Sequence, residues 1–286
     1  MSDAPQKFGF TDEQLATGPL TFRDGLFKDQ VVLITGGGRG IGKAIAVQMA
    51  RLGARIAITG RNEERLAKAN ALIESVGAEV IAIPMSIRDP ELCQRTAEAV
   101  VARYGRIDHL INNAGGQFPQ AAIDFKPKGW LAVVDTNLNG TWYMMQAVAK
   151  HWHATKQPGS IVTIVAVIGR GMPGMAHTAA ARAGVIALSK TVATEWAPLG
   201  IRVNCVAPGI IESDGMDNYD AATVARYPGM NPMRRMGTVR DVADAVCYLS
   251  GPSGAFITGD VVTIDGGGQV WGDFWAVPRP GWFDGT

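Results

Sequence analysis

The sequence contains little cysteine and no long apolar run, and each shortage excludes a class of protein. Its 286 residues include three cysteines, Cys93, Cys205 and Cys247, which lie far apart and form no Cys-x-x-Cys pair. This pattern argues against a disulfide framework and favours free, buried thiols in a reducing compartment. No segment approaches the roughly 18 consecutive apolar residues that a membrane-spanning helix needs. We therefore expect a protein without membrane helices.

Clustered charge is also missing. The chain has 27 basic and 26 acidic residues and a net charge of +1, and no basic tract indicates nucleic acid or an anionic membrane surface as a partner. No cluster of histidines, cysteines and carboxylates has the spacing of metal ligands, so we expect no metal site. The first residues lack the pattern of a secretion signal and the last four are not a peroxisomal address. A cytoplasmic location is the expectation.

Short apolar segments alternate along the chain with amphipathic ones. This alternation indicates a parallel sheet with helices on both faces, the doubly wound α/β arrangement of Rossmann type. We expect a single domain over residues 29–268, preceded by an N-terminal arm (1–28), with a substrate loop at about 210–236 and an aromatic tail (269–286). The seven predicted strands cover 30–35, 54–59, 79–83, 108–112, 160–165, 201–206 and 261–264, and the predicted helices cover 41–52, 62–76, 90–104, 128–153, 176–196 and 239–250.

The tail carries more apolar area than a disordered segment usually does. It contains Trp271, Phe274, Trp275, Trp282 and Phe283. These side chains are expected either to pack in an interface between subunits or to form a wall over a substrate cleft.

A glycine-rich turn after the first predicted strand indicates a dinucleotide site. In Thr35–Gly42 the glycines permit a tight turn and bring a pyrophosphate close to the backbone at the start of a helix, where free N–H groups and the helix dipole favour an anion. The spacing is Gly-x-x-x-Gly-x-Gly rather than Gly-x-Gly-x-x-Gly. The residues expected to bind the cofactor here are Gly36, Gly38, Arg39, Gly40, Ile41 and Gly42.

The end of the second predicted strand favours NADP(H) over NAD(H). An NAD site usually places a carboxylate at this position for the ribose hydroxyls, whereas this chain has Arg61 after Gly60. Together with Arg39, this guanidinium would suit a 2′-phosphate through forked hydrogen bonds. The alternative is that Arg61 only begins a solvated helix.

From about Gln30 to Gly268 the chain resembles the short-chain dehydrogenase/reductase family. The resemblance rests on Thr35–Gly42, Asn112–Gly115, Asn137 in Asp-Thr-Asn-Leu-Asn-Gly, Pro208-Gly209 and Asp265–Gly267. It implies the doubly wound fold, a nicotinamide cofactor at the carboxyl ends of the strands and, commonly, a tetramer. It further implies cofactor contacts from Ser86 and Ile87 at the adenine, from Asn113, Ala114 and Gly115 at the adenosine and ribose, from Pro208, Gly209 and Ile211 at the nicotinamide, and from Arg182 at the ribose.

The usual catalytic residues of that family are serine, tyrosine and lysine, supported by an asparagine. The resemblance places Ala166 at the serine, Thr178 at the tyrosine and Arg182 at the lysine, and only Asn137 is retained. Positions 178 and 182 share a helix face. A threonine does not titrate near neutral pH and an arginine cannot relay a proton. Reduction of a carbonyl by the usual mechanism is therefore disfavoured.

One branch of the family is more similar than the rest. The chain resembles the peroxisomal-type trans-2-enoyl-CoA reductases and, more distantly, the 2,4-dienoyl-CoA reductases, whose tyrosine corresponds to Val167 here. The strings that carry this resemblance are Gly115–Phe118, Lys128–Trp130, Thr141–Met144, His177–Val185 and Glu195–Ala197.

Reduction of an activated C=C bond does not need the missing acid. Hydride goes to the β-carbon, and the enolate that forms on the thioester oxygen needs hydrogen-bond donors. The candidate catalytic residues are Asn137 with an ordered water, Thr178, Arg182 and His177, the last as a titratable acid. The expected substrate contacts are Gln117, Phe118, Tyr143, Ala166 and Met175.

These residues predict an NADPH-dependent reductase of a trans-2-enoyl-CoA. Two alternatives stay open. One is an alcohol or ketone oxidoreductase in which His177 or Tyr143 replaces the usual acid. The other is a cofactor-binding protein that has lost catalysis. His177 as a half-buried structural histidine and Tyr143 as a core or interface residue are the corresponding structural interpretations.

Overall fold

A seven-stranded parallel sheet forms the centre of the molecule in the computed structural model, which describes residues 8–218, 221–272 and 276. The strand order is β3-β2-β1-β4-β5-β6-β9 and every pairing in the sheet is parallel. The predicted fold class and number of strands are thus confirmed. The strands are β1 (Val31–Thr35), β2 (Arg55–Gly60), β3 (Val80–Pro84), β4 (His109–Asn112), β5 (Gly159–Ile164), β6 (Ile201–Pro208) and β9 (Val261–Ile264).

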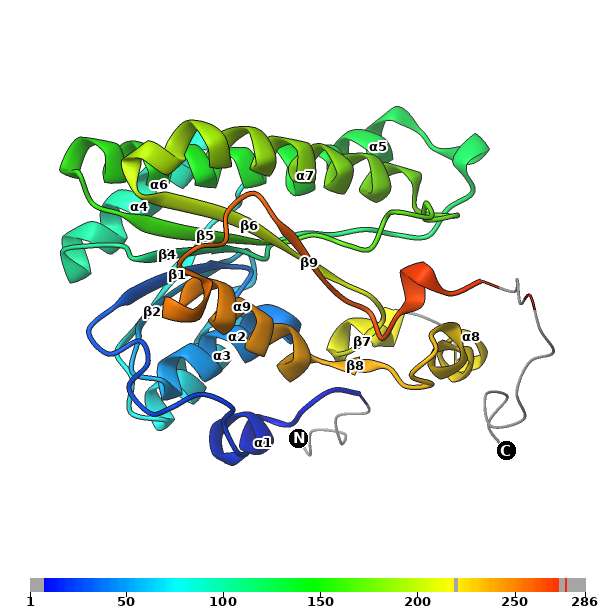
Figure 1. Cartoon of the computed structure of the whole chain (residues 1–286), viewed down its shortest axis with the longest axis horizontal. Helices are drawn as coiled ribbons and strands as arrows, with labels where there is room; N and C mark the ends of the chain where they lie inside the picture. Colours follow the sequence, from blue (N-terminus) through cyan, green and yellow to red (C-terminus); the bar gives the residue numbers. More distant parts are fainter. Residues whose placement is uncertain (1–7, 219–220, 273–275, 277–286) are drawn as a thin grey trace.

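Helices cover both faces of this sheet (Figure 1), which explains why the central strands are apolar on both sides. All five residues of β1 are buried. One face carries α2, α3 and α9 and the other carries α4, α6 and α7, with a separate buried cluster under each layer. The helices are α2 (Gly40–Arg51), α3 (Glu63–Ser75), α4 (Pro90–Tyr104), α5 (Pro127–Val134), α6 (Gly140–Thr155), α7 (Ala176–Trp196) and α9 (Val239–Ser250).

The segment expected as one helix over 128–153 is two helices. A π-helical stretch, Asp135–Asn139, separates α5 from α6. At its centre, the side chain of Asn137 hydrogen-bonds both backbone groups of Gly116, and the hydroxyl of Thr141 donates to the carbonyl of Asn137 at 2.9 Å. A wide turn of this kind frequently occurs at functional sites. Asn137 thus lies in a helix irregularity and joins it to the loop after β4.

The N-terminal arm is more ordered than the sequence predicts. Residues 12–17 form a short helix, α1 (Asp12–Thr17), which begins with a reciprocal capping box between Thr11 and Gln14. Leu15 and Phe27 are buried in the cluster under α2 and α9. The arm is therefore part of the packed domain from residue 8 onward.

The expected substrate loop also contains regular structure. Strands β7 (Ile211–Glu212) and β8 (Gly237–Thr238) pair in parallel, and α8 (Ala221–Arg226) lies between them. Figure 1 shows this unit beyond the carboxyl ends of β6 and β9. Of the aromatic tail, Trp271 is described. The centroid of its ring lies 5.0 Å from Cζ of Arg234. The predictions for Phe274, Trp275, Trp282 and Phe283 fall outside the described residues.

Composition led us to expect no membrane helix, no disulfide framework and no metal site. Among them, no helix is both long and apolar enough to cross a membrane. All three cysteines are unpaired and buried, and burial raises the pKa of Cys93 to about 12 and that of Cys205 to about 11. Within the described part of the chain, no group of three or more histidines, cysteines and carboxylates could hold a metal ion.

Candidate active site

The segments singled out in the sequence meet at one edge of the sheet. The glycine turn follows β1, residues 113–118 follow β4, residues 165–175 follow β5, and Gly209 follows β6. Because these strands are parallel neighbours, their carboxyl ends lie side by side. In open α/β sheets this edge is where ligands bind.

The glycine turn is fixed against the next loop by Asn113. Its amide Nδ2 donates to the carbonyls of Thr35 (3.0 Å) and Gly36 (3.1 Å), and the Thr35 hydroxyl accepts the N–H groups of Asn113 and Ala114, both at 3.0 Å. Gly36 has a φ of +67°, and a Cβ there would lie 2.9 Å from the Cα of Ala114. The glycine is required on both counts. Asn113 thus shapes the turn rather than only lining it.

The two arginines expected at a 2′-phosphate lie in different surroundings. Arg61 is exposed directly after β2, at the carboxyl edge. Arg39, which was expected to converge on the same place, is instead paired with Asp214, with 3.6 Å between Nε and Oδ1. Asp214 follows β7, and no sequence pattern marked it. The difference arises because the fold returns the 210–218 segment to the start of α2.

Other expected cofactor residues divide into surface and core positions. Ser86 is half-buried, whereas Ile87 is 6% exposed and packs against Gly140 at the start of α6. Ile211 is also buried, in contact with Gly237. Gly209 approaches Asp265 so closely that a Cβ would lie 2.7 Å from the Cβ of Asp265. The side chains of Ile87 and Ile211 therefore pack in the protein interior, and their backbones are the parts left to border a ligand.

Asn137 joins the loop after β4 to the start of α7. Its Oδ1 accepts from the N–H of Gly116 at 2.9 Å, and its Nδ2 donates to the carbonyl of Gly116 and to Oγ1 of Thr178, both at 3.0 Å. Both amide hydrogens are thus used inside the protein. The side chain expected to order a water hydrogen-bonds Thr178 in the structure.

The hydroxyl of Thr178 is left with a hydrogen to donate. Thr178 is fully buried, and its Oγ1 accepts the hydrogen bond from Asn137. A hydroxyl that accepts on one lone pair keeps its single O–H for another acceptor. The fold therefore places an oriented, non-titrating donor at position 178.

His177 is buried beside it under two aromatic rings. The ring centroids of Phe118 and Phe125 lie 4.7 and 4.5 Å from that of His177. The N–H of Thr178 donates to Nδ1 at 2.7 Å, which assigns the ring hydrogen to Nε2. No acceptor meets hydrogen-bond geometry with Nε2 among the described residues.

Burial lowers the pKa of His177, although the carbonyls of Met175 and Phe118 partly oppose the shift. The geometric assignment and the pKa direction agree on a neutral imidazole near pH 7. His177 therefore suits the role of a neutral donor better than that of the titratable acid expected from the sequence.

Arg182 is a buried cation close to the same loop. It is 8% exposed and donates to the carbonyl of Ile164 at 2.9 Å. Its guanidinium lies against Gly115, where any Cβ would collide with Nη2. Burial lowers its pKa to about 10, so it stays charged near neutral pH. Among the described residues no carboxylate lies within ion-pair distance, so an anion or ribose hydroxyl would find an incompletely satisfied donor.

The expected substrate residues are only partly brought together. Phe118 contacts His177 and is 36% exposed, Ala166 and Met175 are half-buried, and Gln117 is exposed. Tyr143 instead packs against the core cluster beneath α4 and α6, in line with its structural interpretation.

Phe125 is a contact of His177 that sequence reasoning missed. No motif marked it, because a lone phenylalanine in a loop has no pattern of its own. The wall formed by Phe118, Phe125 and the neighbouring Trp130 becomes visible only once the loop is folded over His177.

Comparison with known proteins places this geometry in a family. The profile of a family described as Enoyl-(Acyl carrier protein) reductase matches residues 36–269. The chain is 39% identical over 243 residues to the protein of Bacillus subtilis named Probable 2,4-dienoyl-CoA reductase, covering 83% of this chain and 96% of that one. It is 35% identical to the 3-oxoacyl-[acyl-carrier-protein] reductase FabG of Escherichia coli, covering 84% and 98%.

Solved structures agree with the sequence relatives. A short chain dehydrogenase from Bacillus anthracis superposes with a TM-score of 0.80 at 39% identity, covering 87% of this chain and 99% of that one. The citronellol catabolism dehydrogenase of Pseudomonas aeruginosa gives 0.78 at 37% identity, covering 87% and 98%.

The chain belongs to the short-chain dehydrogenase/reductase family, and it is an oxidoreductase of that family. Reductases of this family bind a nicotinamide cofactor. The residues present fit such a group, because the glycine turn opens at the start of α2 and Arg182 is a buried donor without a carboxylate partner among the described residues.

Proposed function

We propose that the protein reduces the activated C=C bond of a trans-2-enoyl thioester, with NADPH as the hydride donor. The observation that carries this proposal is the hydrogen bond from Asn137 to Thr178. It places an oriented hydroxyl where the family resemblance puts a titratable tyrosine. A donor that does not ionise suits enolate stabilisation better than proton transfer to an alkoxide.

In the proposed mechanism, the cofactor, when bound, supplies a hydride to the β-carbon of the substrate. Negative charge then develops on the thioester oxygen. The hydroxyl of Thr178 and the Nε2–H of His177 donate to that oxygen, and Asn137 holds the hydroxyl in position. Because both donors are removed from water, their electrostatic effect on the developing charge is stronger than at an exposed site. The α-carbon takes its proton from water afterwards.

Arg182 has a binding role in this proposal. Its charge and its position against Gly115 suit a hydrogen bond to a ribose hydroxyl of the cofactor. The half-exposed ring of Phe118 separates His177 from solvent. An apolar acyl group that packs on Phe118 and displaces it would give the thioester oxygen access to the buried donors.

The preference for NADPH rests on Arg61 and on the lack of a carboxylate after β2. Arg39 would join Arg61 once it leaves Asp214. The printed names of relatives that act on dienoyl-CoA and 3-oxoacyl substrates support an acyl thioester as the substrate class. A homotetramer and a cytoplasmic location stay predictions.

The experiment compares NADPH oxidation by the purified protein with 2-hexenoyl-CoA and with 3-oxohexanoyl-CoA. We expect turnover of the enoyl thioester and at least about a hundredfold lower kcat/KM for the ketone, the size of one transition-state donor interaction. Activity confined to the ketone would overturn the proposal. Binding of NADPH without turnover of either substrate would favour the alternative of a protein that has lost catalysis.

A second candidate function is reduction of a ketone. The 35% identity to 3-oxoacyl-[acyl-carrier-protein] reductases favours it. In that case an ionisable group must give up a proton, and His177 is the titratable side chain that contacts Thr178. We would then expect His177→Phe to abolish ketone reduction. A His177→Phe protein with unchanged ketone turnover would exclude this mechanism.

A further inference from the structure

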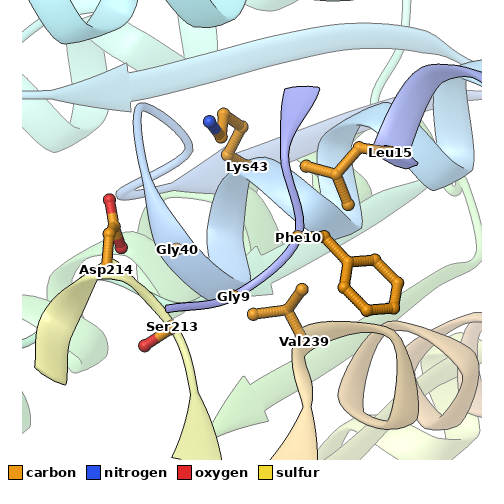
Figure 2. A pocket seen from close by; sticks show the side chains of 8 residues that line it. All are labelled: Gly9, Phe10, Leu15, Gly40, Lys43, Ser213, Asp214 and Val239. Atoms are coloured by element: carbon orange, nitrogen blue, oxygen red, sulfur yellow. The ribbon is translucent and has the colours of Figure 1, made fainter. Parts of the chain in front are cut away.

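A carboxylate lies beside the start of α2, where an anion is favoured. Asp214 follows β7, and its Oδ1 lies 3.1 Å from the position that a Cβ of Gly40 would take. Figure 2 shows the Asp214 side chain beside Gly40, the first residue of α2. The first N–H groups of a helix and its dipole attract negative charge at this point. The side chain of the N-cap residue Arg39 supplies no cap hydrogen bond.

The interaction recorded for this carboxylate among the described residues is a charge contact with Arg39. Its Oδ1 lies 3.6 Å from Nε of Arg39 and, although buried, accepts no hydrogen bond among the described residues. A buried acceptor without a hydrogen bond is costly to the folded state. Asp214 is therefore attracted to the start of α2 but incompletely satisfied there, which makes it displaceable by an anion that bonds the N–H groups directly.

The N-terminal segment, residues 8–20, packs on the chain that carries Asp214. The N–H of Gly9 donates to Oε1 of Glu212 at 3.4 Å, and Phe10 lies under the guanidinium of Arg240 at 5.1 Å. An ion pair between Asp12 and Lys43 fixes the same segment to α2. The resulting small pocket (Figure 2) is lined by Gly9, Phe10, Leu15, Gly40, Lys43, Ser213, Asp214 and Val239.

This segment lies before residue 36, where the match to the family profile begins. It thus lies outside the part of the chain that the profile describes. Its contacts join three places: the start of α2, the end of β7 and the first turn of α9. Residues of the segment thus line one small pocket together with Gly40, Ser213 and Asp214.

We infer that Asp214 is an autoinhibitory competitor for the phosphate site of the cofactor, and that the N-terminal segment keeps it in place. The inference rests on the proposed binding of a nicotinamide dinucleotide. The pyrophosphate must displace the Asp214 carboxylate from the start of α2, and Arg39 is released at the same time. The segment consequently sets how tightly the cofactor binds, without contributing to the chemistry.

The test measures the Kd of NADPH and of NADH by calorimetry, without substrate. Asp214→Asn keeps the size of the side chain and removes its charge. We expect both cofactors to bind roughly threefold to tenfold more tightly, the size of a charge effect at a helix start. The gain should shrink as salt is raised from about 0.05 to 0.5 M, because salt screens a partly exposed charge.

The matched control is Asp260→Asn, an exposed residue directly before β9, at the opposite end of the sheet strands. It should leave both Kd values unchanged. Equal or weaker cofactor binding by Asp214→Asn overturns the inference. Tighter binding of NADPH alone would overturn the placement at the start of α2, because NADH carries the same pyrophosphate. If the wild-type protein binds neither dinucleotide, the proposed function fails instead.

The part played by the N-terminal segment has its own variant. Phe10→Ala removes a side chain of the pocket and its contact with Arg240. We expect it to tighten cofactor binding as Asp214→Asn does, and the double variant to gain no more than Asp214→Asn alone, because both changes act on one contact. Unchanged affinity in Phe10→Ala, or fully additive gains, would contradict this role.

Discussion

Replacing Thr178 by valine removes the hydroxyl that the mechanism uses and keeps the shape of the side chain. Thr178 is fully buried and accepts a hydrogen bond from Asn137 at 3.0 Å. The loss of one preorganised donor to a developing oxyanion lowers kcat by about 10²–10³-fold, or about 2.7–4 kcal/mol of transition-state stabilisation. We expect Thr178→Val to show this loss in NADPH oxidation with 2-hexenoyl-CoA, with the Kd of NADPH unchanged.

The same variant should be less stable, for a separate reason. It leaves one N–H of Asn137 buried without an acceptor, which costs about 1–3 kcal/mol. At about 2–4 °C per kcal/mol, the scale for domains of roughly 150–250 residues, Tm should fall by several degrees. Thermal unfolding monitored by circular dichroism measures this shift independently of activity.

A matched control separates the two effects. Thr141 is equally buried and its hydroxyl donates to the backbone carbonyl of Asn137, so Thr141→Val removes a buried hydroxyl that does not contact the side-chain amide bonded to Thr178. It should lower Tm without the large loss of kcat, and Thr178→Ser should retain most activity. If Thr178→Val keeps kcat within about twofold of Thr141→Val, its hydroxyl is not a transition-state donor and the reasoning is refuted.

Three further predictions address the cofactor site and the core. Gly115→Ala should displace the Arg182 guanidinium, because any Cβ collides with it. We expect a loss of about 1–3 kcal/mol in the free energy of unfolding and weaker NADPH binding in calorimetry. Unchanged binding would contradict a contact between Arg182 and the cofactor. Arg61→Asp should shift the kcat/KM preference from NADPH towards NADH, and an unaltered preference would remove Arg61 from the 2′-phosphate site. Burial lowers the pKa of His109 to about 4, so the folded state binds fewer protons than the unfolded state, whose histidine titrates near about 6.5. The contribution of neutral His109 to the free energy of unfolding should therefore be complete above about pH 6.5 and fall by about 2–4 kcal/mol towards pH 4. Denaturant titrations of wild type and His109→Gln measure it as the difference between the two profiles, which should narrow as the pH falls.

The fold was predictable because its signals are local and repeated. Each central strand is a short apolar run, and the glycine turn marks the first strand-to-helix junction. The break between α5 and α6 was not visible in the periodicity of 128–153. It depends on hydrogen bonds from Asn137 to Gly116, which is 21 residues away in sequence, and hydrophobic periodicity carries no information on such a contact.

The sequence was enough to predict where the residues of the candidate site lie in the fold. It was not enough to predict which of their side chains contact one another. The resemblance placed Thr178 and Arg182 on one helix face, where the structure has them. It could not assign His177 its neutral state, because that follows from burial under Phe118 and Phe125. Nor could it find Asp214, because the pairing with Arg39 depends on how the chain after β7 returns to the glycine turn.

One measurement tests the central claim most directly. The protein is given NADPH and an equimolar mixture of a 2-enoyl and a 3-oxoacyl thioester of the same chain length, and the products are separated by mass. The proposed chemistry predicts the saturated acyl thioester as the first product, with the ketone largely unconsumed. A 3-hydroxyacyl thioester formed first, with the enoyl substrate intact, would contradict the assignment of Thr178 as an enolate donor and return the protein to carbonyl reduction.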